Sequence, residues 1–174
     1  MPPVITSLGP VEATVSRLLI LGSMPGRESL ARQRYYAHPR NAFWPIMTTL
    51  LKAEPDLSYP ERLRLLTGNR ISLWDVIGSC QRAGSLDAAI PAASEAPNPI
   101  DRFCRRHPEL AAIAFNGNRA RDSFRRHFLR KNRVPPTLKL VALPSTSPAY
   151  AALRPEAKLE LWRERLAPWL PTDL

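Results

Sequence analysis

The sequence predicts an α/β protein, a three-layer α/β/α sandwich around a central, mainly parallel sheet of four strands. The first observation is a set of short, continuous apolar runs, which are typical of strands buried on both faces of a parallel sheet. These runs are residues 18–21, 71–74, 110–115 and 138–143. The second observation is that helical patterns lie between them. Strands that alternate with helices form right-handed crossovers, which place helices on both faces of one sheet.

Each expected helix has its own apolar pattern. Apolar residues at helical spacing indicate a helix over residues 43–51, and another follows Pro60, a residue type favoured in the first helical turn. Two later helices each present one apolar face, formed by Ala120, Phe124 and Phe128, and by Leu159, Trp162, Leu166 and Trp169. The segment from Gly84 to Pro99 has weak periodicity, so we expect a surface loop there. We expect residues 1–174 to form a single domain.

The chain is strongly basic. It has 25 Lys and Arg residues against 15 Asp and Glu residues, a formal net charge of +10 and a pI of about 10.6. Arginine dominates these cations, and its guanidinium binds phosphate with two parallel hydrogen bonds. The composition therefore favours a polyanionic partner, namely nucleic acid. A solvated basic surface without such a partner is the alternative.

The cysteine content and the N-terminal sequence exclude other classes. Two cysteines, Cys80 and Cys104, cannot form a cluster or zinc site of four thiolates, and we expect them to be reduced and buried. Residues 1–17 lack the apolar segment of a secretory signal, and no apolar run approaches the ~20 residues that cross a bilayer. We expect a soluble monomer of the bacterial cytosol or nucleoid, without membrane contact.

Each expected strand ends in an unusual segment. In open parallel sheets, ligands bind beyond the carboxyl ends of the strands. We therefore expect these four segments to converge on one crevice: Gly22 to Gly26, Trp74-Asp75, Asn116-Gly117 and Pro144 to Pro148.

The first segment, Gly22-Ser23-Met24-Pro25-Gly26, offers its backbone to a ligand, because glycine permits close approach and leaves amides facing the crevice. No Gly-Lys-Ser/Thr follows it, and the Gly-x-Gly-x-x-Gly spacing is absent. These absences disfavour a P-loop and a nucleotide-binding Rossmann domain. A plain turn at the end of the strand is the alternative interpretation.

Residues 35–44 place two tyrosines, a histidine, an arginine and Asn41 before a helix. Such a segment can stack a nucleobase on an aromatic ring and present an amide that orients water. A helix cap is an equally good interpretation of Asn41, and Phe43 and Trp44 are expected in the core. We expect His38 to form hydrogen bonds within this loop.

Asn116 ends the third strand with one acceptor and two donors in a plane, which suits the Watson–Crick edge of a base. An Asn-Gly turn is the alternative. The two prolines of the last segment stiffen a loop whose hydroxyls and amides can hold a DNA phosphate or enter the duplex. Most arginines of the helix after Asn116 are expected on a solvated face: Arg119, Arg121, Arg125, Arg126 and Arg130.

Together these segments resemble the uracil-DNA glycosylase superfamily, most closely its hypoxanthine-DNA glycosylase branch. The resemblance runs from Leu18 to Ala149 through LILGSMPG, YYAHPRNAFW, ISLWDVIGSC with RAGSLDAAI, IAFNG and LPSTSPA, in that order. The stretch from Ala37 to Trp44 is also similar to the mismatch-specific uracil glycosylases. The resemblance implies a parallel-sheet α/β/α fold, a flipped base in the crevice, and no metal or cofactor.

Two positions depart from the wider superfamily. Met24 stands where most relatives carry an Asp or Asn that activates water, and Leu143 stands where other branches carry a His or Asn. In the hypoxanthine branch the working amide is the Asn of a Pro-Arg-Asn segment, which is present here as Asn41. The resemblance also assigns base stacking to Tyr36 and base reading to Asn116.

The predicted reaction is hydrolysis of the N-glycosidic bond of a deaminated base in double- or single-stranded damaged DNA. We assign catalysis, by positioning water, to Asn41. Base contacts are assigned to Gly22, Ser23, Met24, Tyr36 and Asn116, and contacts to the DNA backbone or a wedge role to Ser145, Thr146, Ser147 and Pro148. No lysine lies near these segments in the sequence, which favours a monofunctional enzyme without lyase activity.

Three questions stay open at this point. Uracil in mismatches, or xanthine, is an alternative substrate, because the first segment and Tyr36 suit several bases. A nucleic-acid-binding domain without catalysis is the alternative from another class, supported by charge. The third question is whether Asp75 and Asp87 structure loops, the role that we favour, or touch the site.

Overall fold

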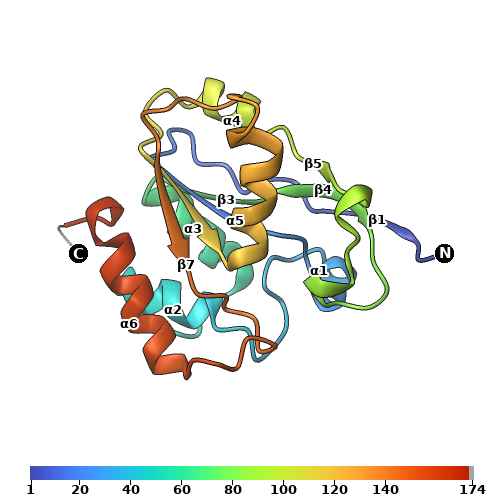
Figure 1. Cartoon of the computed structure of the whole chain (residues 1–174). Coiled ribbons are helices and arrows are strands. Elements are labelled where there is room, and N and C mark those ends of the chain that lie inside the picture. The colour runs from blue at the N-terminus through green and yellow to red at the C-terminus, as the bar shows by residue number, and fades with distance from the viewer. Residues whose placement is uncertain (173–174) are drawn as a thin grey trace.

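The computed structural model describes residues 1–172, and its centre is a parallel sheet with strand order β3-β2-β6-β7 (Figure 1). All neighbouring pairs in this sheet are parallel. Its strands are β2 (Leu18–Gly22), β3 (Ile71–Asp75), β6 (Ala112–Asn116) and β7 (Lys139–Leu143). The four predicted strands and the α/β/α class are therefore confirmed.

Helices cover both faces of this sheet. One face packs against α2 (Phe43–Leu50), α3 (Tyr59–Gly68) and α6 (Pro155–Leu166). The other face packs against α4 (Ile100–Arg106) and α5 (Asn118–Phe124), which a π-helical turn extends over Arg125–Leu129. Successive strand residues point to opposite faces, so Ile20 contributes to the first core and Leu21 to the second.

Local sequence signals explain where the helices begin. Ser58 and Glu61 form a capping box at the start of α3, in which each side chain bonds the other residue's backbone amide. Pro155 occupies the first turn of α6. The apolar face predicted near the C-terminus is real, because Trp162 and Leu166 are fully buried.

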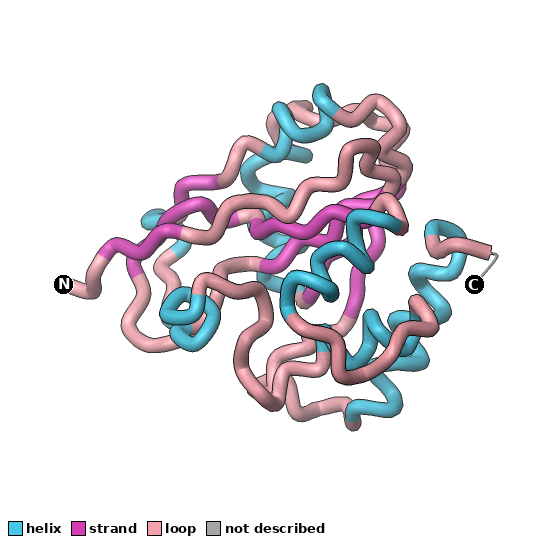
Figure 2. The backbone as a smooth tube through the Cα atoms, turned by 180° about the vertical axis from the view of Figure 1, so that it is seen from behind, coloured by secondary structure: helices cyan, strands magenta, loops and turns pink. Residues whose placement is uncertain are grey.

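A second, antiparallel sheet of order β1-β4-β5 lies beside the first and was not predicted. Its strands are β1 (Val4–Thr6), β4 (Ile77–Gln81) and β5 (Ala96–Pro97). Only Val76 separates β4 from β3, so the chain passes from one sheet directly into the other (Figure 2). Strands this short carry too few alternating residues to give a periodic signal.

The segment from Gly84 to Pro99 connects β4 to α4, as predicted, but it is more ordered than a surface loop. It contains two short 3₁₀ turns, Asp87–Ala89 and Ala92–Ser94, before β5. Ile90 is only 4% exposed, and it packs with Met24, Ile77 and Cys80 in a small separate core. This anchoring fixes one wall of the crevice described below.

Cys80 and Cys104 are free and buried, as predicted. Within residues 1–172, no helix is both long enough and apolar enough to span a bilayer.

Candidate active site

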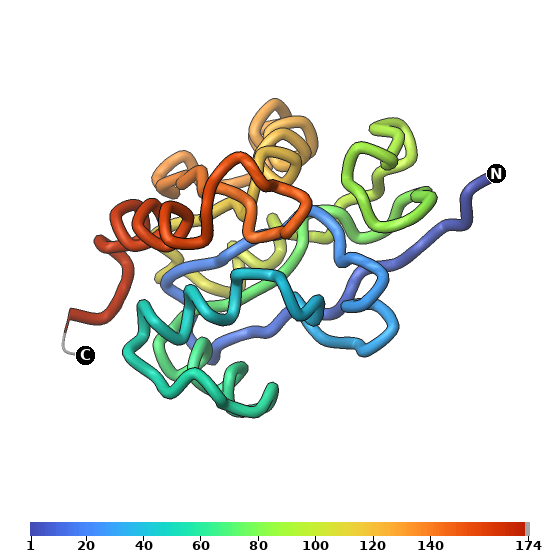
Figure 3. Tube along the Cα trace, turned by 90° about the horizontal axis from the view of Figure 1, so that it is seen from below, coloured from blue at the N-terminus to red at the C-terminus, as the bar shows by residue number. Residues whose placement is uncertain are grey.

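A cavity of about 640 Å³ lies at the carboxyl ends of the parallel strands. Its size is within the range of small-molecule sites. The segments after β2 and β7 and the segment between β4 and β5 meet around it (Figure 3). The residues predicted for the site all line this one cavity: Gly22, Ser23, Met24, Tyr36, Asn41, Asn116, Ser145, Thr146, Ser147 and Pro148. The predicted convergence of the four strand ends is therefore observed.

The floor of the cavity is built around Gly22. A Cβ atom at this position would lie 2.5 Å from Asp75 Oδ1 and 2.9 Å from the Tyr36 hydroxyl oxygen. No larger residue fits without displacing both groups. Met24, beside it, places its side chain in the small core with Ile77 and Ile90, so only its backbone is available for polar contacts with a ligand.

Tyr36 presents its ring to the cavity from a left-handed backbone conformation, with φ of 54°. One side of the ring stacks on Phe43, with centroids 4.1 Å apart and an interplanar angle of 27°. The residue is half-buried and lines the cavity, so part of the ring remains open to a ligand. Burial, reinforced by the charge of Asp75, raises the pKa of Tyr36 and keeps its hydroxyl neutral.

Asn41 combines the two roles considered for it. Its Oδ1 accepts a hydrogen bond of 3.0 Å from the Phe43 amide at the start of α2. Because only an oxygen can accept from that amide, the orientation of the Asn41 side chain is fixed. The residue is half-buried and lines the cavity, with its Nδ2 donors and one Oδ1 lone pair unused by this bond.

Asn116 and Thr146 tie the ends of two strands together. Asn116 Nδ2 donates to the Thr146 hydroxyl and Asn116 Oδ1 accepts from the Thr146 amide, both at 2.9 Å. The Thr146 carbonyl accepts from the Ala42 amide at 3.0 Å, which brings the start of α2 into the same cluster. Asn116 keeps one N–H donor and one lone pair for a ligand.

The last loop divides into an anchor and an accessible part. Thr146 is 1% exposed and serves as the anchor. Ser145, Ser147 and Pro148 are half-buried and face the cavity. These three residues are therefore accessible to a DNA strand, whereas the buried Thr146 is not.

Asp75 and Asp87 line the cavity, so of the two roles left open for them, structuring loops or touching the site, the structure places both at the site. Asp87 accepts a hydrogen bond of 2.6 Å from the Ser23 hydroxyl. Asp75 is 3% exposed, and its Oδ2 has no hydrogen-bond partner among the described residues. Burial, together with the negative charge of Asp87, raises the pKa of Asp75 to about 8, against a lowering effect of Arg82. The sequence signal for Asp75 was its place at the end of a largely apolar strand.

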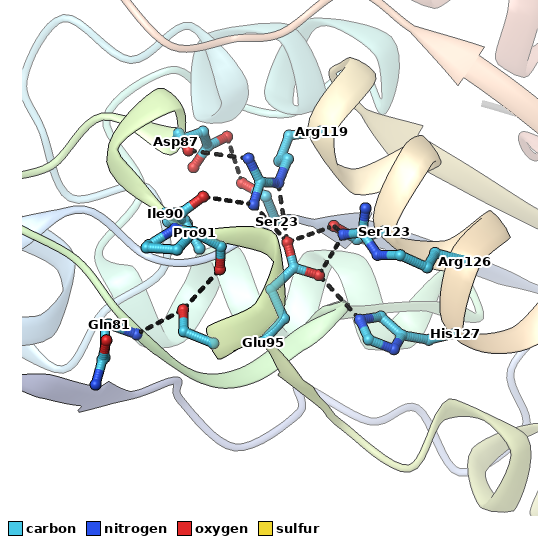
Figure 4. A network of polar contacts seen from close by, with 11 residues as sticks. Ser23, Gln81, Asp87, Ile90, Pro91, Glu95, Arg119, Ser123, Arg126 and His127 are labelled. Carbon is cyan, nitrogen blue, oxygen red and sulfur yellow. Dashed lines mark hydrogen bonds and ion pairs between the residues drawn. The ribbon is translucent and has the colours of Figure 1, made fainter.

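A buried carboxylate holds the wall that carries Asp87 (Figure 4). The Glu95 side chain is fully buried and accepts from Arg119 at 2.5 Å, Arg126 at 2.7 Å and His127 at 2.9 Å. Arg119 also donates to the carbonyl of Asp87 at 3.2 Å and to that of Ile90 at 3.0 Å. Although burial opposes ionisation, these donors hold the pKa of Glu95 below its usual value.

Two arginines of this helix are therefore exceptions to the solvated face predicted for most of them. Arg119 and Arg126 bind Glu95 and pin the segment from Asp87 onwards to the helix. At the cavity itself lie Arg27 and Arg40, both exposed and without an acidic partner in the described part of the chain. These two are the better candidates for phosphate contact.

One lysine lies closer to the predicted site than the sequence indicated. Lys158, on α6, donates from Nζ to the Ser147 carbonyl at 3.1 Å, and its pKa is lowered by burial. It is not among the residues that line the cavity. Its hydrogen bond holds the loop of Ser147 from the side away from the cavity.

The described residues offer no group of three or more His, Cys, Asp or Glu side chains placed to hold a metal ion. The polar atoms at the cavity are carboxyl, amide and hydroxyl groups beside one aromatic ring. Such a set binds a planar heterocycle through stacking and hydrogen bonds. Fold and site together define an α/β protein with a polar pocket, large enough for a nucleobase, at the carboxyl edge of its sheet.

The chain belongs to the uracil DNA glycosylase superfamily, whose family model matches residues 10–169. It is similar to a hypoxanthine DNA glycosylase of Methanosarcina acetivorans, with 38% identity over 106 residues, 60% of this chain and 66% of that protein. A hypoxanthine DNA glycosylase of Methanosarcina barkeri is 34% identical over 112 residues, 64% of this chain and 70% of that protein.

The fold also matches a solved structure. A solution NMR structure of a Methanosarcina acetivorans protein, described as a candidate uracil DNA glycosylase, superposes with a TM-score of 0.74 at 30% identity. The match covers 93% of this chain and 98% of that one. The family resemblance and the fold predicted from the sequence are confirmed.

Replacing Glu95 by Ala should weaken the wall of the cavity. The change removes the acceptor shared by Arg119, Arg126 and His127, and it should lower the free energy of unfolding by about 1–3 kcal/mol in urea denaturation. Glu28→Ala, which breaks an exposed pair with Arg32, is the matched control and should cost no more than about 0.5 kcal/mol. Equal effects of the two substitutions would contradict a structural role for Glu95.

The raised pKa of Asp75 should appear in the pH dependence of stability. Between about pH 4 and pH 8 folded Asp75 keeps a proton that the unfolded chain has lost, so ionisation favours unfolding as the pH rises. The unfolding free energy of the wild type should fall relative to that of Asp75→Asn by up to about 1.4 kcal/mol per pH unit in this window. Urea denaturation of both proteins at pH 5, 6 and 7 measures the difference, and parallel curves would contradict the raised pKa.

Proposed function

We propose that this protein is a monofunctional DNA glycosylase that removes hypoxanthine, the deaminated form of adenine, from damaged DNA. The observation that carries the proposal is one cavity, large enough for a nucleobase, that collects all the predicted site residues at the carboxyl edge of the sheet. Both curated relatives named above are hypoxanthine DNA glycosylases, which supports the choice of base. An enzyme of this kind must take the base out of the duplex before cutting the bond.

The flipped base is proposed to lie on Tyr36. The Phe43 ring fixes Tyr36 from one side, so a purine can stack on the part of the ring that faces the cavity. The free donor and lone pair of Asn116 then reach the edge of the base, and the backbone of Gly22, Ser23 and Met24 approaches it from the floor. Stacking tolerates several bases, so uracil and xanthine remain the alternative substrates.

The attacking water is proposed to be held by Asn41. Cleavage of the glycosidic bond passes through an oxocarbenium-like sugar, while negative charge builds on the departing base. An amide is a poor base, so Asn41 acts by position: the Phe43 amide fixes its side chain, which orients a water molecule toward the sugar. The missing general base is consistent with a transition state in which the leaving group departs early.

The DNA backbone is proposed to cross the rim of the cavity. Arg27 and Arg40 supply positive charge there, and the Ser145 and Ser147 hydroxyls supply donors. Pro148, on the same loop, is placed to fill space that the flipped nucleotide leaves in the duplex. A DNA-binding domain without catalysis would need the charge but not the polar floor of the cavity.

The chain is further proposed to act as one domain and as a monomer in the bacterial cytosol. All the segments of the site come from a single copy of the chain and one edge of one sheet. Nothing in the proposed chemistry requires a second subunit.

The direct test is base release from duplexes that carry inosine, uracil or xanthine opposite each normal base, at enzyme excess. We expect inosine to be cut fastest, leaving an intact abasic site, and borohydride to trap no covalent adduct because Lys158 does not face the cavity. Absence of cutting on every duplex would refute the proposed function. A trapped adduct that Lys158→Met abolishes would refute only its monofunctional character.

Substitution of Asn41 separates its cap from its catalytic role. Asn41→Ala removes both, whereas Asn41→Asp keeps an oxygen acceptor for the Phe43 amide but loses the N–H donors. We expect the single-turnover rate on inosine DNA to fall at least 100-fold in Asn41→Ala with DNA affinity retained, while its stability falls by about 1 kcal/mol.

Asn41→Asp should keep wild-type stability. A comparison of its rate with that of Asn41→Ala therefore shows whether the loss of the helix cap causes the loss of activity. Unchanged single-turnover rates in both variants would remove Asn41 from the mechanism. Loss of DNA binding in parallel with the rate, measured by fluorescence anisotropy, would instead favour a binding role.

A further inference from the structure

Two residues at the floor of the cavity each have a buried polar atom without a hydrogen-bond partner in the described part of the chain. Asp75 Oδ2 and the Tyr36 hydroxyl form no hydrogen bond of acceptable geometry with any of residues 1–172, although the hydroxyl lies near the Asn116 amide. Asp75 Oδ1 and the Tyr36 hydroxyl lie against Gly22, and both residues line the cavity that a ligand would occupy. Burying an unpaired polar group is unfavourable, so the persistence of these two points to a ligand that supplies the partner.

The two carboxyl groups of the cavity differ in their surroundings. Burial raises the pKa of Asp87 too, but the hydrogen bond from the Ser23 hydroxyl and the nearby cations Arg82 and Arg119 oppose this rise. Asp75 has no cation within ion-pair distance in the described chain. Arg82 is the cation whose charge lowers the pKa of Asp75, but two of its nitrogens donate hydrogen bonds to the carbonyls of Pro25 and Gly84.

The other titratable groups around Asp75 add no positive charge. Tyr35 and Tyr36, from the segment before α2, are neutral phenols whose pKa values burial raises. Asp87, from the segment after β4, contributes a negative charge. When two neighbouring carboxyl groups differ in their surroundings, the less solvated group has the higher pKa and keeps its proton. Asp75 is therefore the group that carries a proton at neutral pH.

We propose that Asp75, in its protonated form, is the catalytic residue that stabilises the departing base by donating its carboxyl proton to an acceptor atom of that base. This inference rests on the proposed glycosylase function. For hypoxanthine the acceptor is O6 or N7, the atoms on which negative charge gathers as the glycosidic bond lengthens. Asp75 would thereby take over a role that Leu143 cannot perform, because the aliphatic side chain of Leu143 is 3% exposed and has no hydrogen-bond donor.

The reaction balances with water as the only co-reactant. The C1′–N9 bond breaks and its electron pair goes to the purine, while the water oxygen forms a new bond to C1′. Asp75 transfers its proton to the purine, which leaves as neutral hypoxanthine. The water loses a proton to solvent, and the Asp75 carboxylate regains one from solvent before the next turnover.

The test is the pH dependence of the single-turnover rate on inosine DNA, from pH 6 to pH 10, for the wild type and Asp75→Asn. The wild-type rate should be level at the acid end and fall about tenfold per pH unit above a midpoint near pH 8. Asp75→Asn keeps a donor that cannot ionise, so its rate should be 10- to 1,000-fold lower and should lack the fall near pH 8. Ionisation of the inosine base itself lowers both rates alike at higher pH, so the ratio of the wild-type rate to the Asp75→Asn rate isolates the contribution of Asp75.

A second variant keeps the test decisive if Asp75→Asn is too slow to time. Because the charge of Asp87 raises the pKa of Asp75, Asp87→Asn should move the wild-type midpoint to lower pH. A ratio of wild-type rate to Asp75→Asn rate that does not change with pH, or a midpoint that Asp87→Asn leaves in place, would overturn the role of Asp75. In either case wild-type cutting of inosine would leave the proposed function intact, whereas no cutting at any pH would overturn both.

Discussion

The register of the parallel sheet decides where every group of the candidate site lies. Gly22 pairs with Asp75, and Asn116 pairs with Leu143, so the last residues of four strands form one row. Successive side chains of a strand point to opposite faces, so a slip by one residue would turn each member of this row away from its neighbours. The buried apolar residues that precede the row hold this register, because a slip would also misplace the two cores.

A few hydrogen bonds convert this row into a rigid cavity. The pair of Asn116 with Thr146 joins β6 to the loop after β7, and Asp87 with Ser23 joins the first loop to the opposite wall. Glu95 then fixes that wall to the helix behind it. Because these contacts are made within the protein, the polar groups of the cavity are held in position before a ligand arrives, which is the condition for electrostatic catalysis.

The surplus of arginine serves two purposes that composition cannot distinguish. Arg119 and Arg126 satisfy a buried carboxylate and belong to the scaffold. Arg27 and Arg40 are exposed at the cavity, have no acidic partner among the described residues, and suit the phosphate backbone of DNA. Only the place of each guanidinium relative to acidic groups, far away in the sequence, separates the two kinds.

The sequence by itself determined the main sheet, the helices on its faces and the segments at the strand ends, because apolar periodicity and turn residues are local properties of the chain. It also gave the family, through ordered motifs that the family model matches over residues 10–169. It missed the small antiparallel sheet, whose short strands leave no periodic pattern, and it gave Asp75 and Asp87 a lesser role.

The tertiary structure alone decided which polar atoms have partners. Asn41 is held by the Phe43 amide, Thr146 by Asn116, and Lys158 reaches a loop that is remote from it in sequence. Asp75 Oδ2 is left without a hydrogen-bond partner among residues 1–172. The protonation state of a carboxyl group depends on desolvation and on neighbouring charges, and both are set by residues that only folding brings together.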